Sequence, residues 1–196
     1  MTTFTAETLE QHASRYETVQ PLATVEAEHL EILPATFADG EYGWRDLEWV
    51  VQWYFRRFLG AYPNADRRAA ESAFGENAYD AVHESITGAV EADSTAAKLE
   101  CLVDLTGVDY PIASAFLSYL DPARYVVMGP AEWTVLADAG ELEEAYPETP
   151  SLEDYRRYLE ACIDIRERCN TDLWTVYRGL WMEWYESLEG VDPSSL

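Results

Sequence analysis

The feature that most constrains the fold of this chain is a helical repeat of apolar residues, which recurs from one end to the other. Residues 44–59 carry the clearest instance, because an α-helix brings positions three and four apart onto one side. The apolar positions on that face are Leu47, Val50, Val51, Tyr54 and Phe58. No run of alternating residues is long enough for a sheet. The sequence therefore predicts an all-α fold of roughly eight to ten helices, as a single domain over residues 1–196.

Residues that start or stop helices place the boundaries. Gly60 lies where a left-handed residue closes the helix 44–59, and Gly140 is expected to end the helix 131–139. Asn64 and Asn77 are expected to cap the helices that follow them. Pro34 is expected to begin only a short turn, closed by Gly40, within an otherwise irregular stretch. The predicted helices cover residues 6–20, 44–59, 64–75, 77–92, 95–105, 111–120, 131–139, 152–169 and 172–187.

The charge of the chain is strongly one-sided. Thirteen basic residues face 37 acidic ones, which gives a formal net charge of −24. Such a charge opposes compaction in dilute buffer. At about 1 M salt the Debye length falls to about 3 Å, and the repulsion between the charges is largely screened. The acidic residues are interspersed with seven Trp and 13 Tyr rather than gathered in a tail. This distribution predicts a folded protein adapted to a salt-rich cytoplasm.

Several classes of protein are disfavoured by the sequence. No stretch approaches the roughly 20 apolar residues that span a bilayer, and the start of the chain lacks the basic and apolar regions of a signal peptide. We expect a cytoplasmic protein without a membrane partner. Since cysteines are few and odd in number, and no histidine stands at metal-ligand spacing from them, we expect no disulfide framework, no metal and no cofactor. These residues are Cys101, Cys162, Cys169, His12, His29 and His83.

Residues 105–117, which read LTGVDYPIASAFL, form the most specific motif. Two apolar helices meet at a tight turn that contains Gly107, and Pro111 opens the second helix, where a missing N–H costs nothing. Ala113 and Ala115 are small enough to let the helices approach closely. The motif predicts a helix-hairpin-helix at about residues 95–120.

This hairpin resembles the helix-hairpin-helix of the DNA glycosylases, which reads Leu-x-Gly-Val-Gly before an Ala-containing helix. The resemblance is closest to an uncharacterised bacterial and archaeal group within that superfamily, and it suggests a member of haloarchaeal type. The resemblance also covers the connection 121–128, Trp133 and the terminal helix around 172–181, and spans roughly residues 47–184. In the family, backbone N–H groups of the hairpin grip a DNA phosphate.

The chain departs from the glycosylase pattern at three positions. The resemblance places Gly129 at the catalytic aspartate and Pro111 at the Schiff-base lysine, so neither a carboxylate nor an amine is available there. Asp109 replaces the second glycine of the hairpin, and its charge opposes a phosphate. We therefore expect degenerate catalytic positions. Glu132, one turn beyond Gly129, is a weak catalytic candidate that we expect to be an ordinary helix-surface residue.

The candidate nucleic-acid-binding residues are the hairpin and two arginine pairs: Thr106, Gly107, Val108, Asp109, Tyr110, Arg56, Arg57, Arg67 and Arg68. Each has a simpler interpretation. The hairpin could be a packing element, Asp109 a turn residue, and the arginines, with Arg156-Arg157, partners of surface carboxylates. The terminal aromatic stripe Trp174, Tyr177, Trp181 and Trp184 is typical of a core, and a base-stacking platform is the alternative.

Three functions remain in view from the sequence. The first is a non-catalytic protein that keeps the glycosylase scaffold and binds DNA or another nucleic acid, which an Arg-rich face would favour. The second is a protein-interaction or accessory module on the same scaffold, which a large exposed Trp/Tyr patch would favour. The third is a repair enzyme using a different carboxylate, such as Glu132. The sequence favours the first.

Overall fold

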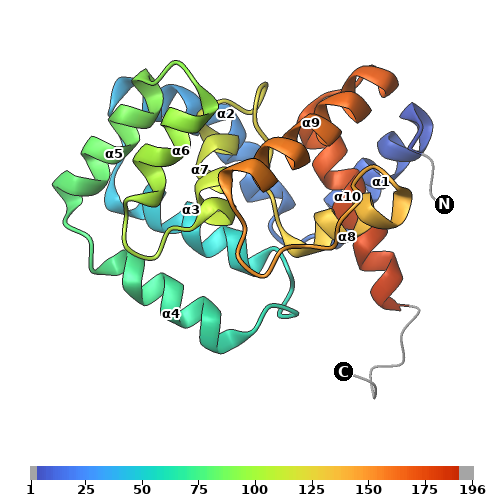
Figure 1. Ribbon diagram of the computed structural model, residues 1–196, viewed down its shortest axis with the longest axis horizontal. Helices are drawn as coiled ribbons and strands as arrows, with labels where there is room; N and C mark the ends of the chain where they lie inside the picture. The colour runs from blue at the N-terminus through green and yellow to red at the C-terminus, as the bar shows by residue number, and fades with distance from the viewer. Residues whose placement is uncertain (1–3, 190–196) are drawn as a thin grey trace. The chain divides into compact units, whose positions relative to one another are not determined.

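The computed structural model describes residues 4–189, and these form ten helices and no strands (Figure 1). The prediction of an all-α fold with eight to ten helices is therefore confirmed. The helices are α1 (Ala6–Val19), α2 (Ala23–Asp39), α3 (Trp44–Arg56), α4 (Asn64–Gly75), α5 (Tyr79–Glu91), α6 (Thr95–Val103), α7 (Tyr110–Leu120), α8 (Pro130–Ala139), α9 (Leu152–Cys169) and α10 (Leu173–Glu189).

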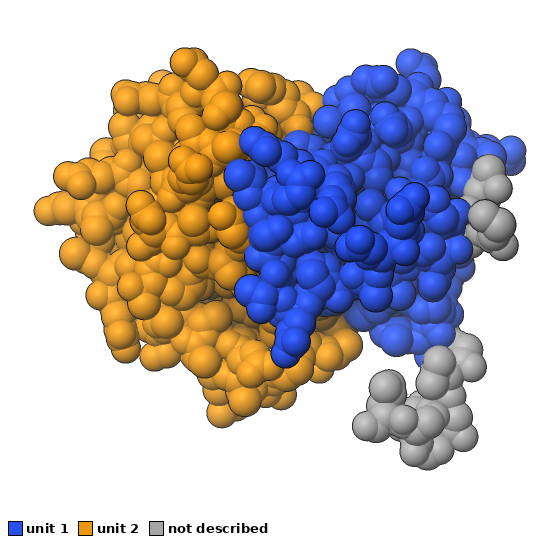
Figure 2. Space-filling view, in the orientation of Figure 1, with its two compact units in different colours: residues 1–24, 128–196 blue, residues 25–127 orange. Residues whose placement is uncertain are grey.

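The chain divides into two compact units, which Figure 2 colours separately. Unit 1 takes the described parts of residues 1–24 and 128–196, and unit 2 takes residues 25–127. Unit 1 thus joins the two ends of the described chain, and the hairpin motif lies wholly in unit 2. A single domain over residues 1–196 stays a prediction.

In unit 1, helix α10 packs against α1, α8 and α9. The predicted aromatic stripe supplies much of this packing, because Trp174, Tyr177 and Trp181 are all buried. Trp181 meets Tyr16 of α1 edge-on, with ring centroids 5.0 Å apart. The prediction that the stripe is core is confirmed for these three residues, which leaves no exposed stacking platform among them.

In unit 2, α3 packs against α4 and α7, while α6 packs against both α5 and α7. The predicted apolar face of α3 is buried throughout. Helix α7 is buried on nearly every side, with Phe116 fully enclosed. Ala113 and Ala115 are also fully buried, as their small size led us to expect.

Helix α2 corrects one prediction. Pro34 was expected to start a short turn, yet it lies inside a continuous helix of 17 residues. Proline in a helix costs about 3 kcal/mol through a lost hydrogen bond and a ring clash. Leu33 and Phe37 beside it are buried, and burying two such side chains contributes about 3–6 kcal/mol. Tertiary packing therefore outweighs the local break.

The remaining boundaries agree with the prediction to within a few residues. The chief difference is at α3, which ends at Arg56 because Leu59 already adopts a positive φ of 52°, before Gly60 at 91°. Gly60 thus has the predicted left-handed conformation, and Gly140 follows the end of α8, as predicted, with φ 81°. Cys162 and Cys169 are buried as expected. Within residues 4–189 no helix is both long enough and apolar enough to cross a membrane.

Candidate functional site

The predicted hairpin is formed by α6, the turn 104–109 and α7. Gly107 has a φ of 79°, in the left-handed region that favours glycine. The turn is closed by the N–H of Val108, which donates to the carbonyl of Leu105 at 3.1 Å. Two helices joined through Gly107 are what the motif predicted for residues 95–120.

Gly107 is also the point where the hairpin touches α4. A Cβ at this position would lie 2.6 Å from the backbone nitrogen of Phe74 and 2.8 Å from the carbonyl oxygen of Ala70. Both atoms belong to helix backbone and cannot rotate away. The glycine is therefore required by packing as well as by its φ, whether or not the hairpin binds anything.

Asn77 ties the hairpin to the end of α4. Its side-chain amide donates to the carbonyls of Thr106 and Phe74, both at 2.8 Å. Its side-chain oxygen accepts from the N–H of Thr106 at 3.0 Å. The prediction that Asn77 caps the next helix was wrong, since the N-cap position of α5 is held by Ala78, which makes no side-chain capping bond. The amide is used to satisfy both backbone groups of Thr106.

Asp109 is the N-cap of α7, and its carboxylate accepts the N–H of Ile112 at 3.0 Å. Desolvation by the surrounding chain raises the pKa of Asp109, and hydrogen bonds from the N–H groups of Ile112 and Asp109 itself partly oppose this. A phosphate bound by such a hairpin would need the N–H groups at this helix N-terminus. In this chain a carboxylate of the protein's own takes that place.

A hollow of about 390 Å³ lies beside the hairpin in unit 2. Phe55, Ala70, Val108 and Ile112 are its apolar side chains, and its polar side chains are Tyr62 and two carboxylates. Desolvation raises the pKa of Tyr62, Asp109 and Asp66 raise it further, and Arg57 opposes them. The residues around the hollow are Phe55, Tyr62, Asp66, Ala70, Gly107, Val108, Asp109 and Ile112. The surface next to the hairpin is therefore anionic.

In the part of the chain that the structure describes, only two of the four arginines in the predicted Arg-rich face are exposed and outside ion pairs. Arg57 is fully buried, its Nε donates to the carbonyl of Tyr54 at 3.1 Å, and its guanidinium lies 4.3 Å from the centroid of Phe58. It cannot reach a phosphate from there. Arg67 pairs with Glu71 at 3.2 Å, in line with the salt-bridge alternative.

Arg56 and Arg68 differ from these two because both are exposed. Within the described residues neither takes part in an ion pair. Of the other arginine pair named from the sequence, Arg156 meets Glu153 at 3.8 Å and Arg157 meets Glu144 at 3.3 Å. Only Arg56 and Arg68 of the predicted nucleic-acid-binding arginines are therefore available to a polyanion.

The two positions that the sequence resemblance assigned to catalysis, Pro111 and Gly129, hold no reactive group. Pro111 is buried in the first turn of α7, and Gly129 is the extended N-cap of α8. Glu132 was expected on a helix surface, and that prediction was wrong, because the residue is fully buried. Its neighbours Ala131, Trp133 and Val135 along α8 are buried as well.

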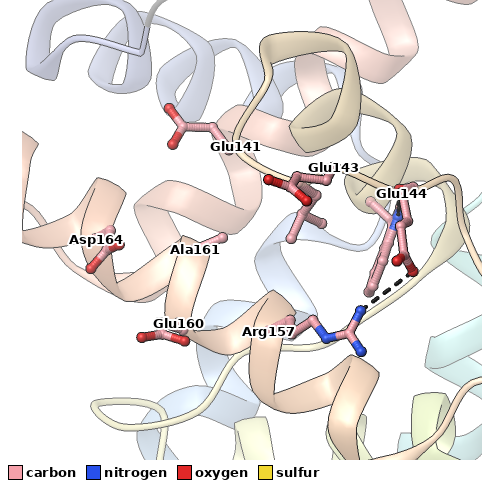
Figure 3. Close-up of a pocket in the computed structure, with 9 residues that line it drawn as sticks. Glu141, Glu143, Glu144, Arg157, Glu160, Ala161 and Asp164 are labelled. Atoms are coloured by element: carbon pink, nitrogen blue, oxygen red, sulfur yellow. Dashed lines mark hydrogen bonds and ion pairs between the residues drawn. The ribbon is translucent and has the colours of Figure 1, made fainter.

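A second hollow, of about 450 Å³, lies in unit 1 and was not foreseen from the sequence (Figure 3). Trp133, Leu142 and Ala161 form its apolar part. Its remaining residues are mostly acidic: Glu141, Glu143, Glu144, Arg157, Glu160 and Asp164. Residues 157, 160, 161 and 164 are spaced to share one face of a helix. That spacing, after the acidic segment 141–144, is the signal that could have revealed it.

The negative charge of this second hollow, the acidic groove, is partly neutralised by arginines. Arg157 reaches Glu144 at 3.3 Å, the pair joined by a dashed line in Figure 3, and Glu153 at 3.8 Å. Arg168 pairs with Glu141. Trp133 is held in place by its indole N–H, which donates to the carbonyl of Glu144 at 2.8 Å. The lining of the acidic groove is mostly carboxylates, so its chemistry is that of a charged surface.

Neither hollow has the make-up of a metal centre. Among residues 4–189 no three His, Cys, Asp or Glu side chains come together as a group that could hold a metal ion. Comparison of the chain with protein-family models, with curated proteins and with solved structures finds no match. The interpretation of the site therefore depends on its own geometry.

Proposed function

We propose that this chain is a non-catalytic helical module that binds a protein partner and uses the helix-hairpin-helix as a scaffold. The observation that carries the proposal is the capping of α7 by Asp109. A hairpin that grips a phosphate needs free N–H groups and no negative charge beside them. Asp109 occupies one of these groups, and Asn77 occupies the N–H of Thr106.

The absence of a reactive side chain at Gly129 and Pro111 supports the non-catalytic part of the proposal. Glycosidic cleavage of the family type needs a carboxylate or an amine at those positions. Glu132, the alternative carboxylate, is fully buried and does not line either hollow. A fully buried carboxylate is not presented to a base that is flipped out of a duplex.

Binding of nucleic acid is the second candidate, and the exposed pair Arg56 and Arg68 favours it. Against it, two carboxylates, Asp66 and Asp109, border the hollow next to the hairpin. At molar salt the release of counterions contributes little to affinity, so two arginines would have to bind by direct contact. We therefore place it after the protein partner.

The experiment that separates the two candidates is an anisotropy titration. A fluorescein-labelled duplex and the matching single strand are titrated with the full chain at about 0.2 M and about 2 M KCl. We expect no saturable rise in anisotropy at either salt. A saturable rise that Arg56→Gln/Arg68→Gln abolishes, and that the matched control Arg45→Gln/Arg124→Gln leaves intact, would overturn the proposal in favour of nucleic acid.

A further inference from the structure

We propose that the hollow beside the hairpin in unit 2 binds an arginine side chain from a basic segment of a protein partner. The inference deepens the proposed function and rests on it, because it names the chemistry of the partner. The hairpin that suggested a site for a phosphate anion would here contribute to a site for a cation.

The apolar part of the lining suits the aliphatic part of an arginine. Phe55, Val108 and Ile112 belong to it, and each of these residues is almost fully buried. Only a small part of each is therefore left to meet a ligand. A bare metal ion would gain nothing from such apolar side chains, since hard cations need oxygen ligands around them. An organic cation with apolar surface is the better match.

Two carboxylates supply the charge complement. Asp66 and Asp109 both border the hollow. Asp66 is exposed, whereas the carboxylate of Asp109 is partly withdrawn from water where it caps α7. Their negative charges act together on Tyr62, whose phenol also borders it. No basic residue lines the hollow, and Arg57, the cation that lowers the pKa of Tyr62, is buried. The site is therefore built with a charge that its own chain does not neutralise.

The walls are held in place before any ligand arrives. Tyr62 contacts Phe55 at 5.0 Å and Phe58 at 5.4 Å between ring centroids. The hairpin side is fixed by Gly107 against α4 and by the capping bond of Asp109. A preformed site loses less conformational entropy on binding.

Arginine fits the expected solvent better than lysine does. At about 1 M salt the Debye length is about 3 Å, so attraction between more distant charges is largely screened. Long-range steering is then lost, and direct contact must supply the affinity. A guanidinium is weakly hydrated, stacks on aromatic rings and pairs with carboxylates through two N–H groups. Tyr62 and the two aspartates, which offer those contacts, all border the same hollow.

The test uses a fluorescein-labelled hexa-arginine peptide, titrated with the full chain at about 2 M KCl. The neutral isostere hexa-citrulline serves as the ligand control. We expect saturable binding of hexa-arginine and none of hexa-citrulline. Asp66→Asn/Asp109→Asn should weaken the affinity about tenfold or more, because it removes both carboxylate partners. Asp66→Asn alone, at an exposed position, should weaken it less and guards against misfolding of the double variant.

The matched control is Glu28→Gln/Glu31→Gln, which removes two exposed carboxylates from the same unit. We expect it to leave the affinity within about twofold of the unchanged chain. No binding of hexa-arginine, or equal losses in both double variants, would overturn the inference. The two proposals fail in different experiments. Binding of DNA through Arg56 and Arg68 would overturn the proposed function. A failure of hexa-arginine to bind would overturn only the inference about the hollow.

Discussion

At the scale of single residues, Gly107 makes the sharpest prediction. Gly107→Ala should lower the free energy of unfolding by about 2–5 kcal/mol, from about 1–2 kcal/mol for a left-handed non-glycine residue and the rest from overlap with α4 backbone. Urea unfolding followed by circular dichroism at about 2 M KCl measures this. The control is Gly75→Ala at the end of α4, where a Cβ meets nothing within 4 Å. It should be neutral or raise stability by about 0.4–1 kcal/mol.

Equal effects of the two alanine substitutions would show that Gly107 is not packed against α4. The pair is informative because the residues differ in what surrounds them and not in their type. Gly107 also has the left-handed φ of 79°, whereas Gly75 closes a regular helix.

Residue type alone was a poor guide to burial of charge. Glu132 and Arg57 were expected to meet solvent because charged side chains seldom lie inside a protein, yet both are fully buried. Arg57 illustrates why: its long side chain lies against Trp53, Tyr54 and Phe58, rings that the sequence places only on the same stretch of chain. Which of them surround a guanidinium depends on tertiary packing.

At the scale of the element, α7 is capped by a carboxylate whose pKa is raised above its usual value of 3.8. The folded state therefore binds this proton more tightly than the unfolded state does. The contribution of Asp109 to stability is fully present below pH 3.8 and is lost as the pH rises through the raised pKa. Asparagine caps a helix equally well and does not titrate.

Relative to the unchanged chain, Asp109→Asn should accordingly become more stable as the pH rises from 3.8 towards neutrality. Urea unfolding at a series of pH values measures the difference. Asp109→Ser, which also caps without charge, should follow the same curve. A difference that does not change with pH would contradict the assignment of the raised pKa to this cap.

Elements with strong periodicity and clear caps could be predicted from the sequence. Helix α9 has the predicted bounds, 152–169, because Ser151 caps its start and Asn170 adopts the left-handed conformation at its end. Helix α2 could not be predicted, since its proline argues locally for a break and the burial of Leu33 and Phe37 is a tertiary effect. The same limit applies to the hollow beside the hairpin, whose residues come from α3, α4, α7 and the connecting turns.

At the scale of the whole molecule, charge dominates. The formal net charge of −24 remains after the ion pairs that the arginines form, because a pair brings charges together without changing their sum. Many acidic residues, among them Glu28, Glu31, Glu143 and Glu160, are exposed. Repulsion among exposed carboxylates reaches about 10 Å at 0.1 M salt and only about 3 Å at 1 M. Stability should therefore depend on salt more strongly than for a protein of balanced charge.

We expect the melting temperature, followed by circular dichroism, to rise steeply between about 0.1 M and about 1 M KCl and to level off above that. Each kcal/mol gained corresponds to about 2–4 °C for a chain of this length. Glu28→Gln/Glu31→Gln/Glu143→Gln/Glu160→Gln should raise the melting temperature at low salt and flatten the rise, because fewer charges remain to be screened. If both proteins rose in parallel, salt would be acting through general strengthening of apolar burial, and the acidic surface would not be the cause of the salt dependence.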